Sequence, residues 1–456
     1  MKKLTFKETM FVASMLFGMF FGAGNLIFPV SMGQMSGSHM WQAAAGFLVT
    51  GVGLPLLSVA ALGISRETGL QGLSSRVGKR YGIFFTCALY LTIGPFFATP
   101  RCASVSFTVG IERMLSEETA AGAGHFWWQA GFSLVFFAVV LFFSLRPGEI
   151  MTWIGKVLNP LFLVMLGILV IRALTAPMGS PAQIEPQGAY ESGAFFTGLL
   201  EGYNTMDALA GLAFGIVVID VIRRLGVGEP GQIAKGTVKA GVFSSVLMAL
   251  IYILVTLVGA QSRGIFEAAP NGGEALAQIA DHYFGKAGML ILAVLVTVAC
   301  LKTAIGLTTS CSAAFQEMFP HGPKYQIWVA GFVGLSFLTA NLGLDAIVAY
   351  AVPVLMFLYP LAIVLVILTL CGKWFDNDKT VLRWTIAFTG AAALVDFFRT
   401  LPEGTREFLH ISGLTEAAEA WIPLSEQGLG WVIPAGIGLV IGLLIRCKRQ
   451  TACLDS

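Results

Sequence analysis

Two carboxylates and an amide lie close together in one otherwise apolar segment. Residues 195–207 read FFTGLLEGYNTMD, so Glu201, Asn204 and Asp207 follow a run of aromatic and aliphatic side chains. Ionisable groups in an apolar helix are costly, and they usually serve binding or transport. Gly202 lies between these groups and weakens a regular helix at this point. The segment therefore predicts a polar site within an interrupted helix.

A second weak point occurs near the N-terminus, where residues 20–29 read FFGAGNLIFP. Gly22, Gly24 and Asn25 are followed one turn later by Pro29, a combination that disfavours continuous helix. An alternative interpretation is close helix packing through small residues. If the helix is broken, free N–H groups begin its second half and free carbonyls end its first half. One end suits a carboxylate and the other suits a small cation, as a free amino acid with Na⁺ would supply.

The composition shows which surroundings these segments need. Of 456 residues, 56% are apolar and only 12% are charged, about half the usual charged fraction. This excludes a soluble enzyme, a nucleic-acid-binding protein and a disordered chain, and the net charge of +2 offers no field for a polyanion. The seven cysteines show no CxxC spacing, so neither a metal site nor a disulfide framework is indicated. The chain is expected to lie in a lipid bilayer.

Apolar stretches of about 20 residues are long enough to cross a membrane as helices. We expect an all-α polytopic membrane protein with twelve such spans. Their predicted ranges are 6–32, 40–64, 81–111, 127–145, 150–173, 193–221, 236–262, 286–317, 326–343, 346–372, 381–399 and 428–446. The weak points fall in spans one and six, which suggests two five-helix repeats, 1–175 and 186–372, followed by two additional helices over 381–446.

Cationic residues predict the orientation of these spans. With the N-terminus in the cytoplasm, 20 of the 28 Lys and Arg residues fall on the inner side and six on the outer side. The positive-inside rule therefore favours two cytoplasmic termini. The longest hydrophilic stretches, 174–192 and 400–427, are too short for a catalytic domain, so we expect no enzyme activity.

Two cations remain inside the predicted spans. Arg101 lies about 20 residues into span three, roughly 30 Å from the inner face at 1.5 Å per residue. We interpret it as part of an outer gate facing Glu201, or alternatively as a side chain that snorkels to the interface. Lys302 lies near the middle of span eight, on the same helix face as Thr309. Pairing with Glu201 or Asp207 is an alternative role for this lysine.

Span eight is also rich in hydroxyl groups. Five Ser and Thr residues occur between 303 and 312. Thr309 and Ser310 are candidate oxygen ligands for a hard cation. The alternative is that these hydroxyls bond back to carbonyls of their own helix.

The chain resembles the bacterial branched-chain amino acid:cation symporters, the BrnQ or LIV-II carriers, over essentially its whole length. The most specific stretches are FFGAGNLIFP (20–29), GPFFATPR (94–101) and EGYNTMDALAG (201–211), with AIGLTTSCS (304–312) in support. This family is placed with the amino acid–polyamine–organocation carriers, which share the leucine-transporter fold. The resemblance implies inward transport of leucine, isoleucine and valine, driven by Na⁺ or, in some members, H⁺.

The resemblance also implies roles for individual residues. Backbone N–H groups of Gly22, Ala23 and Gly24 would hold the substrate carboxylate, and carbonyls of Gly202–Thr205 would meet the amino group. The residues expected to line the substrate site are Phe20, Gly22, Ala23, Gly24, Asn25, Phe196, Glu201, Gly202, Tyr203, Asn204 and Thr205, with Phe21 and Phe195 as further aromatic candidates. A sodium site would use carbonyls of Gly18, Phe21 and Gly306 and hydroxyls of Thr309 and Ser310. Arg101, Asp207 and Lys302 are expected to serve gating or coupling.

Several functional alternatives stay open at this level. Lys302 could replace the sodium ion, which would make the carrier H⁺-coupled, with another small apolar amino acid or metabolite as its substrate. A channel would instead need rings of like groups along a pore. We expect no cofactor beyond the coupling ion, no nucleic-acid partner and no obligate protein partner. The expected location is the bacterial inner membrane.

Overall fold

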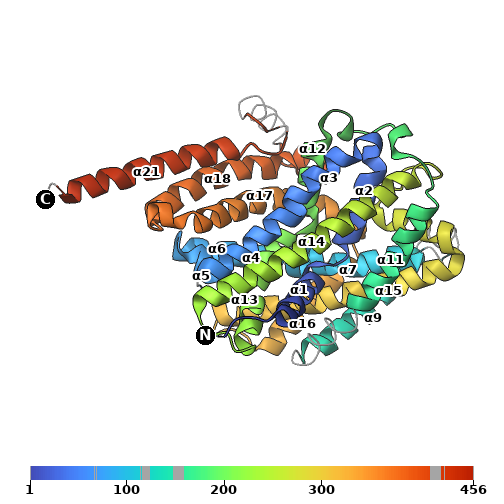
Figure 1. The fold of residues 1–456 in the computed structure, drawn as a ribbon, viewed down its shortest axis with the longest axis horizontal. Helices are drawn as coiled ribbons and strands as arrows, with labels where there is room; N and C mark the ends of the chain where they lie inside the picture. Colours follow the sequence, from blue (N-terminus) through green and yellow to red (C-terminus); the bar gives the residue numbers. More distant parts are fainter. Residues whose placement is uncertain are drawn as a thin grey trace.

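The computed structural model describes residues 2–65, 67, 69–112, 115, 124–146, 159–410, 423–425 and 427–454. These residues form helices joined by short turns, and no β-strand occurs among them (Figure 1). The helices are α1 Phe6–Phe20, α2 Gly24–Ser36, η1 Gly37–His39, α3 Met40–Leu48, η2 Val49–Gly53, α4 Leu54–Ser65, α5 Leu70–Ser75, α6 Lys79–Leu91, η3 Thr92–Phe96, α7 Ala98–Gly110, α9 Gly124–Ser144, α11 Asn159–Thr175, η6 Pro181–Gln183, α12 Tyr190–Glu201, η7 Gly202–Thr205, α13 Asp207–Arg224, α14 Pro230–Ser262, α15 Gly272–Met318, α16 Tyr325–Ala340, α17 Leu344–Leu370, η8 Gly372–Phe375, α18 Lys379–Arg399, α19 Glu403–Phe408 and α21 Val432–Leu454.

Both predicted helix breaks are present. Phe21 is extended, with φ −72° and ψ 98°, and it separates α1 from α2. In the sixth predicted span, the short helix η7 is followed by Met206 in the left-handed region, with φ 63° and ψ 12°, before α13 begins at Asp207. The segments on either side of Met206 are bent by 41°. Each break thus interrupts the backbone hydrogen bonding of one long apolar segment.

The third predicted span, 81–111, has nearly its expected extent but is less regular than expected. It runs from Lys79 to Gly110 through α6, the π-helical segment η3 and α7. Gly94 within η3 has non-helical angles, φ −89° and ψ −114°, and Pro95 follows it. The prolyl nitrogen cannot donate, so the helical hydrogen-bond ladder is disrupted here. The residues after η3, including Arg101, are therefore displaced from where a straight helix would place them.

The expected count of twelve spans is not established by the helix lengths. Seven described helical segments are long and apolar enough to cross a membrane, and the bent pair α12–α13 makes an eighth. The apolar helices α11 and α16 fall short of this length, and α1 is short because it ends at the break. The beginning of the fifth predicted span, 150–158, lies outside the described residues.

Two helix pairs approach each other through reciprocal glycines. A Cβ atom at Gly33 of α2 would lie 2.1 Å from the Thr256 carbonyl oxygen of α14, and one at Gly259 of α14 would lie 2.3 Å from the Val30 carbonyl oxygen of α2. The same relation joins α3 and α12. There, a Cβ at Gly46 would lie 1.9 Å from the Phe195 oxygen, and one at Gly198 would lie 2.0 Å from the Ala43 oxygen. Only glycine permits backbones to cross this closely.

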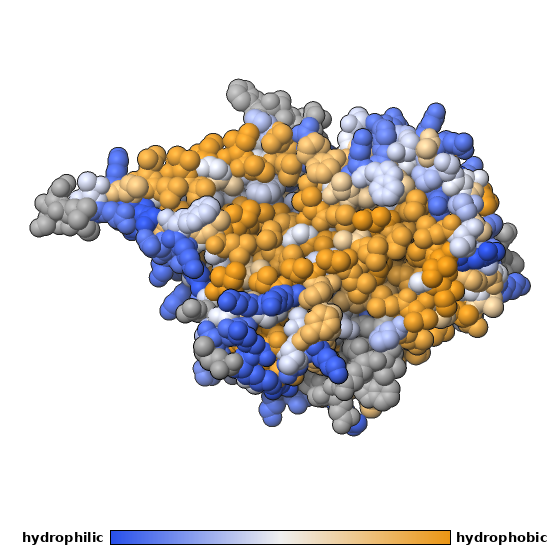
Figure 2. All heavy atoms as spheres, viewed as in Figure 1, coloured by the Kyte–Doolittle hydropathy of each residue, from blue (hydrophilic) through white to orange (hydrophobic). Residues whose placement is uncertain are grey.

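The surface agrees with a position in lipid. Figure 2 shows a broad band of hydrophobic residues across the molecule, with hydrophilic residues gathered toward its edges. Large apolar side chains such as Trp127, Val135 and Ile171 are exposed on its helices. The last helix, α21, packs along α18 and extends beyond the other helices (Figure 1). Two ion pairs, Arg446–Asp376 and Arg449–Asp378, join its basic end to the residues just before α18.

Candidate functional site

The two helix breaks meet at one small cavity, which we call the central cavity. Its volume is about 30 Å³, which is room for about two water molecules. It is lined by Met19, Phe20, Gly22, Ala23, Gly24, Asn25, Ile93, Ala98, Arg101, Cys102, Thr205, Met206, Asp207, Ala210, Phe214, Thr303 and Leu307. The breaks, α7 and α15 therefore supply its polar wall, while Phe20, Phe214 and Leu307 supply an apolar one.

Asp207 joins the two breaks through hydrogen bonds. Its Oδ2 atom accepts from the Asn25 side-chain amide at 2.5 Å and from the Tyr252 hydroxyl at 2.8 Å. Asn25 in turn accepts from the Gly22 backbone N–H at 2.8 Å, which supports the unwound segment between α1 and α2. All three side chains are buried. Because buried polar groups are costly without partners, this network stabilises both breaks in one arrangement.

Arg101 lies at the central cavity instead of near the outer end of its span. Its side chain is 4% exposed, and its Nη1 atom donates to the Asn204 carbonyl at 2.6 Å. The guanidinium also lies over the Phe28 ring, 5.0 Å from the ring centroid. Its expected depth assumed a straight helix, whereas the span contains the irregular segment η3. Among the described residues, no hydrogen bond joins Arg101 to Glu201 directly; Asn204 lies between them, and its side-chain amide donates to the Glu201 carboxylate at 3.2 Å.

Other predicted substrate-site residues line a second cavity, the Glu201 cavity, of about 540 Å³. It is bounded by Phe196, Glu201, Tyr203 and Asn204 and by Val352, Leu355 and Met356 of α17. The Tyr203 ring stacks on Tyr359 with centroids 4.0 Å apart. Phe196 is 38% exposed here, and Phe195 is similarly exposed. The structure thus brings Phe196, Glu201, Tyr203 and Asn204 to this second cavity instead of to the wall of the central cavity.

The remaining predicted residues around the breaks have separate positions. Phe20 lines the central cavity beside Phe214, whereas Phe21 packs against Phe162 and Tyr252. Gly202 packs closely against Thr50, because a Cβ there would lie 2.0 Å from the Thr50 hydroxyl oxygen. The Thr205 hydroxyl donates to the Gly202 carbonyl at 2.9 Å.

In α15 the structure brings Thr303 to the break. Its hydroxyl donates to the Ala299 carbonyl at 3.2 Å and lies 3.4 Å from the Phe21 carbonyl oxygen. Lys302 is buried beside it, with Nζ 5.6 Å from the centroid of the Phe162 ring. These residues approach the carbonyl end of α1, where the sequence predicts a cation.

The predicted cation ligands Thr309 and Ser310 lie farther along α15. Ser310 lines a third cavity of about 250 Å³, and Thr309 beside it is half-buried. Gly18 and Gly306 are buried, as is Phe21. The Phe21 carbonyl lies next to Thr303, whereas Ser310, about two helical turns farther along α15, lines this third cavity.

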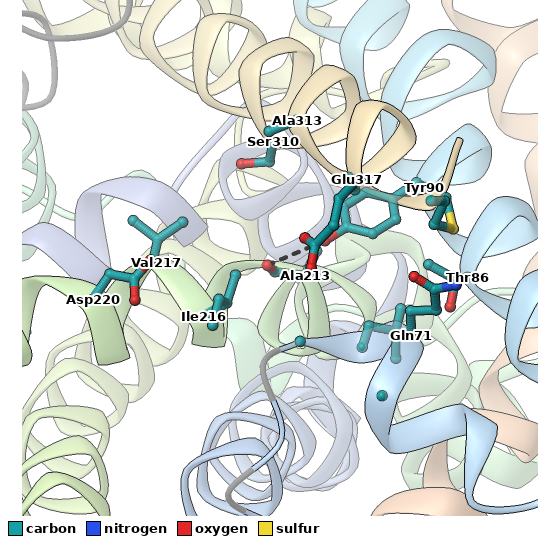
Figure 3. Close-up of a pocket in the computed structure, with 15 residues that line it drawn as sticks. Gln71, Thr86, Tyr90, Ala213, Ile216, Val217, Asp220, Ser310, Ala313 and Glu317 are labelled. Carbon is teal, nitrogen blue, oxygen red and sulfur yellow. Dashed lines mark hydrogen bonds between the residues drawn. The ribbon is translucent and has the colours of Figure 1, made fainter. Parts of the chain in front are cut away.

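We call the third cavity the Glu317 cavity (Figure 3). Ala213, Val217 and Asp220 of α13 face Ser310 and Glu317 of α15 across it, and the Tyr90 hydroxyl bonds to the Ala213 carbonyl at 3.5 Å. The helices of the sixth predicted span thus line all three cavities in turn. The α12 end lines the Glu201 cavity, the residues after Met206 line the central cavity, and the far part of α13 lines the Glu317 cavity.

Sequence reasoning missed Tyr252 and passed over Thr303. Tyr252 is one of several hydroxyl-bearing residues in a 33-residue apolar helix, and nothing in its spacing distinguishes it from the others. Thr303 belongs to the same hydroxyl-rich segment as Thr309 and follows Ala299 by four residues, as Ser310 follows Gly306. This repeated spacing, a small residue followed four positions later by a hydroxyl, is the sequence feature that could indicate Thr303.

Comparison with known proteins identifies the family. A family model described as branched-chain amino acid transport protein matches residues 5–449. The chain belongs to this family. The transporter is 51% identical over 436 residues to the branched-chain amino acid permease BrnQ of Lactobacillus delbrueckii subsp. lactis, covering 96% of each chain. It is 35% identical over 445 residues to BrnQ of Escherichia coli (strain K12), covering 97% of this chain and 96% of the relative.

Two solved structures share the fold of the transporter. The nucleobase-cation-symport-1 family transporter Mhp1, closed with bromovinylhydantoin bound, matches with a TM-score of 0.60 over 97% of this chain and 93% of its own. MhsT in complex with L-phenylalanine matches with a TM-score of 0.54 over 97% and 99%. At 16% identity each, they show the leucine-transporter fold alone. The transporter is thus a multi-pass membrane protein of that fold, and it is not an enzyme.

Proposed function

We propose that this protein imports leucine, isoleucine and valine across a bacterial inner membrane by cation symport with alternating access. The main support is the meeting of both helix breaks at one cavity with a polar and an apolar side. The relatives are named as permeases for the same substrate class. The sequence motifs further favour membership of the amino acid–polyamine–organocation carriers.

The proposed substrate pose follows from the two sides of the central cavity. The start of α2 offers backbone N–H groups to a carboxylate, and the side of the cavity formed by Thr205 and Asp207 would receive the amino group. Once the central cavity widens to admit a substrate, Phe20, Phe214 and Leu307 would contact its apolar side chain. One methylene in an apolar pocket is worth only about 1–3 kcal/mol, so the three branched-chain amino acids are expected to share the site.

Alternating access requires that the central cavity open to either side. The Arg101–Asn204 hydrogen bond lies between the central cavity and the Glu201 cavity. The Phe20–Phe214 contact, with ring centroids 6.4 Å apart, lies on the side of α13 that leads to the Glu317 cavity. We propose that these contacts form two alternating barriers, with both termini and the Glu317 cavity on the cytoplasmic side. The repeats 1–175 and 186–372 would supply the moving helices.

The proposed coupling ion is Na⁺, bound at the carbonyl end of α1. The Phe21 carbonyl and the Thr303 hydroxyl offer oxygen ligands there. The buried Lys302 beside them favours a second candidate, coupling to H⁺. One inward charge is worth about 2.3 kcal/mol per 100 mV, which corresponds to roughly 50-fold accumulation.

The test is uptake of radiolabelled leucine into proteoliposomes with an imposed Na⁺ gradient, an imposed pH gradient, or neither. Accumulation with the Na⁺ gradient alone supports the sodium proposal, whereas accumulation with the pH gradient alone assigns the coupling to H⁺. Accumulation with neither gradient would contradict symport. Excess unlabelled valine and isoleucine should compete, and excess lysine serves as the control.

A further inference from the structure

The guanidinium of Arg101 lies against the positive end of a buried helix. A Cβ atom at Gly24, the first residue of α2, would lie 2.7 Å from Arg101 Nη2 and 3.2 Å from its Cζ. Ala23 provides no side-chain cap, and the first N–H groups of a helix have no acceptors within it. The helix dipole makes this end favourable for an anion and unfavourable for a cation. A fixed guanidinium at this point adds a second positive group.

The donors of Arg101 are only partly used. Its Nη1 atom donates to the neutral Asn204 carbonyl, and its buried Nε atom has no acceptor among the described residues. The nearby carboxylates are already engaged: Asp207 accepts from Asn25 and Tyr252, and Glu201 accepts from Asn204. No ion pair to Arg101 forms within the part of the chain that the structure describes. A buried guanidinium carries five donors, and leaving them unused is costly.

We propose that Arg101 binds the α-carboxylate of the transported amino acid, together with the free N–H groups at the start of α2. The inference rests on the proposed function, because it takes an amino acid as the ligand. Arginine can grip a carboxylate through two parallel hydrogen bonds, which gives both strength and orientation. A carboxylate in the central cavity, at the edge where the guanidinium meets the start of α2, would use donors of both groups at once.

This role makes a specific demand on the ligand. A substrate must carry a free carboxylate, whereas leucinol keeps the side chain and the ammonium group but replaces the carboxylate with an alcohol. A hydrogen bond with an ionised partner is roughly twice as strong as one between neutral groups. The wild-type protein should therefore bind leucine about 100-fold more tightly than leucinol.

The experiment is ligand-dependent thermal stabilisation of the purified full-length protein, titrated to millimolar leucine or leucinol. Arg101→Gln should weaken leucine binding about 100-fold and leave leucinol almost unchanged, so that the preference collapses to a few-fold. Arg101→Lys should weaken leucine binding about 10-fold, because the ammonium keeps the charge but cannot form the two parallel hydrogen bonds of a guanidinium. Arg449→Gln, far from the cavities, is the control and should retain the wild-type preference.

The outcomes separate this inference from the proposed function. An equal loss for leucine and leucinol in Arg101→Gln would show that Arg101 only closes or supports the site, and would overturn the inference alone. If Arg101→Gln does not fold, as its ligand-free melting curve would show, an unchanged leucine preference in Arg101→Lys would overturn it instead. If the wild-type protein binds no branched-chain amino acid, the proposed function fails and the inference fails with it.

Discussion

The Tyr252 hydroxyl donates to the Oδ2 atom of Asp207 at 2.8 Å, so that the middle of α14 is tied to the first residue of α13. The same oxygen accepts from Asn25 at the start of α2. One carboxylate oxygen thus connects three helices at the wall of the central cavity. Any movement that separates the two breaks must first release one of these bonds.

Replacing Tyr252 with Phe should weaken leucine binding about 10-fold or more. The substitution removes the hydroxyl donor and keeps the ring, and a hydrogen bond to a charged group is worth about 1.5–3 kcal/mol. The measurement is the leucine concentration that gives half-maximal thermal stabilisation. Tyr359→Phe is a matched control, since the buried Tyr359 hydroxyl makes no regular hydrogen bond with a described residue. Wild-type affinity in Tyr252→Phe would contradict the role of this bond.

Asn25→Ala should destabilise the unwound segment as well as the Asp207 network. Asn25 accepts from the Gly22 N–H at 2.8 Å and donates to Asp207 and to the Tyr252 hydroxyl, so these bonds are lost together. Combined with Tyr252→Phe in a double-mutant cycle, its effect on the melting temperature should be non-additive, because both side chains share one carboxylate oxygen. Strict additivity would show that the two contacts act independently.

Gly24→Leu should abolish leucine binding. A Cβ at Gly24 already lies 2.7 Å from Arg101 Nη2, so a larger side chain displaces the guanidinium and fills the cavity wall. Gly24→Ala should weaken binding about 10-fold, since the end of a flexible arginine can shift. Gly167→Ala in α11 is the control, because no atom lies within 4 Å of a Cβ built there. The measurement is leucine binding to purified protein, and wild-type affinity in Gly24→Leu would refute the placement of the site.

Thr303→Ala should raise the Na⁺ concentration needed for half-maximal leucine uptake, because it removes a hydroxyl next to the Phe21 carbonyl. The double variant Thr309→Ala with Ser310→Ala should leave this concentration unchanged. Uptake into proteoliposomes at graded Na⁺ measures both. If the double variant raises this Na⁺ concentration and Thr303→Ala does not, the cation site lies at Thr309 and Ser310, as the sequence predicts. An uptake independent of Na⁺ in every variant would favour Lys302 and H⁺.

Gly198→Ala should destabilise the protein without touching the central cavity. Its Cβ would lie 2.0 Å from the Ala43 carbonyl oxygen, and relief requires α12 and α3 to move apart. Overpacking of this kind costs about 1–3 kcal/mol, which should appear as a lower melting temperature in detergent. Gly331→Ala in α16 meets no neighbour and should be neutral or slightly stabilising. Equal melting temperatures for the two variants would argue against the close crossing.

The helix breaks were predictable because local chemistry determines them. Glycine and asparagine weaken a helix wherever they occur together, so Gly22–Asn25 and Gly202–Asn204 were found without knowledge of the fold. The carboxylate at Asp207 was informative for a similar reason, since a charge within an apolar segment is rare. Local residue type was sufficient for these features.

The depth and direction of side chains could not be obtained in the same way. Arg101 was placed from a constant rise of 1.5 Å per residue, and the π-helical segment with Gly94 and Pro95 invalidates that assumption. Ala299–Thr303 and Gly306–Ser310 offer the same spacing, so only the packing against Phe21 distinguishes them. The position of Tyr252 depends on how α14 packs against α2, which no local pattern reveals.

The reciprocal glycine crossings bear on how the molecule is assembled. Each crossing pairs a helix from residues 1–175 with one from 186–372, since α2 packs on α14 and α3 packs on α12. During synthesis, α2 and α3 therefore enter the membrane well before their partners exist. Neither half of the chain can complete a crossing by itself, so each half should need the other in order to mature. Two separately synthesised halves would then be expected to find each other in the membrane, with these four glycines as the points of contact.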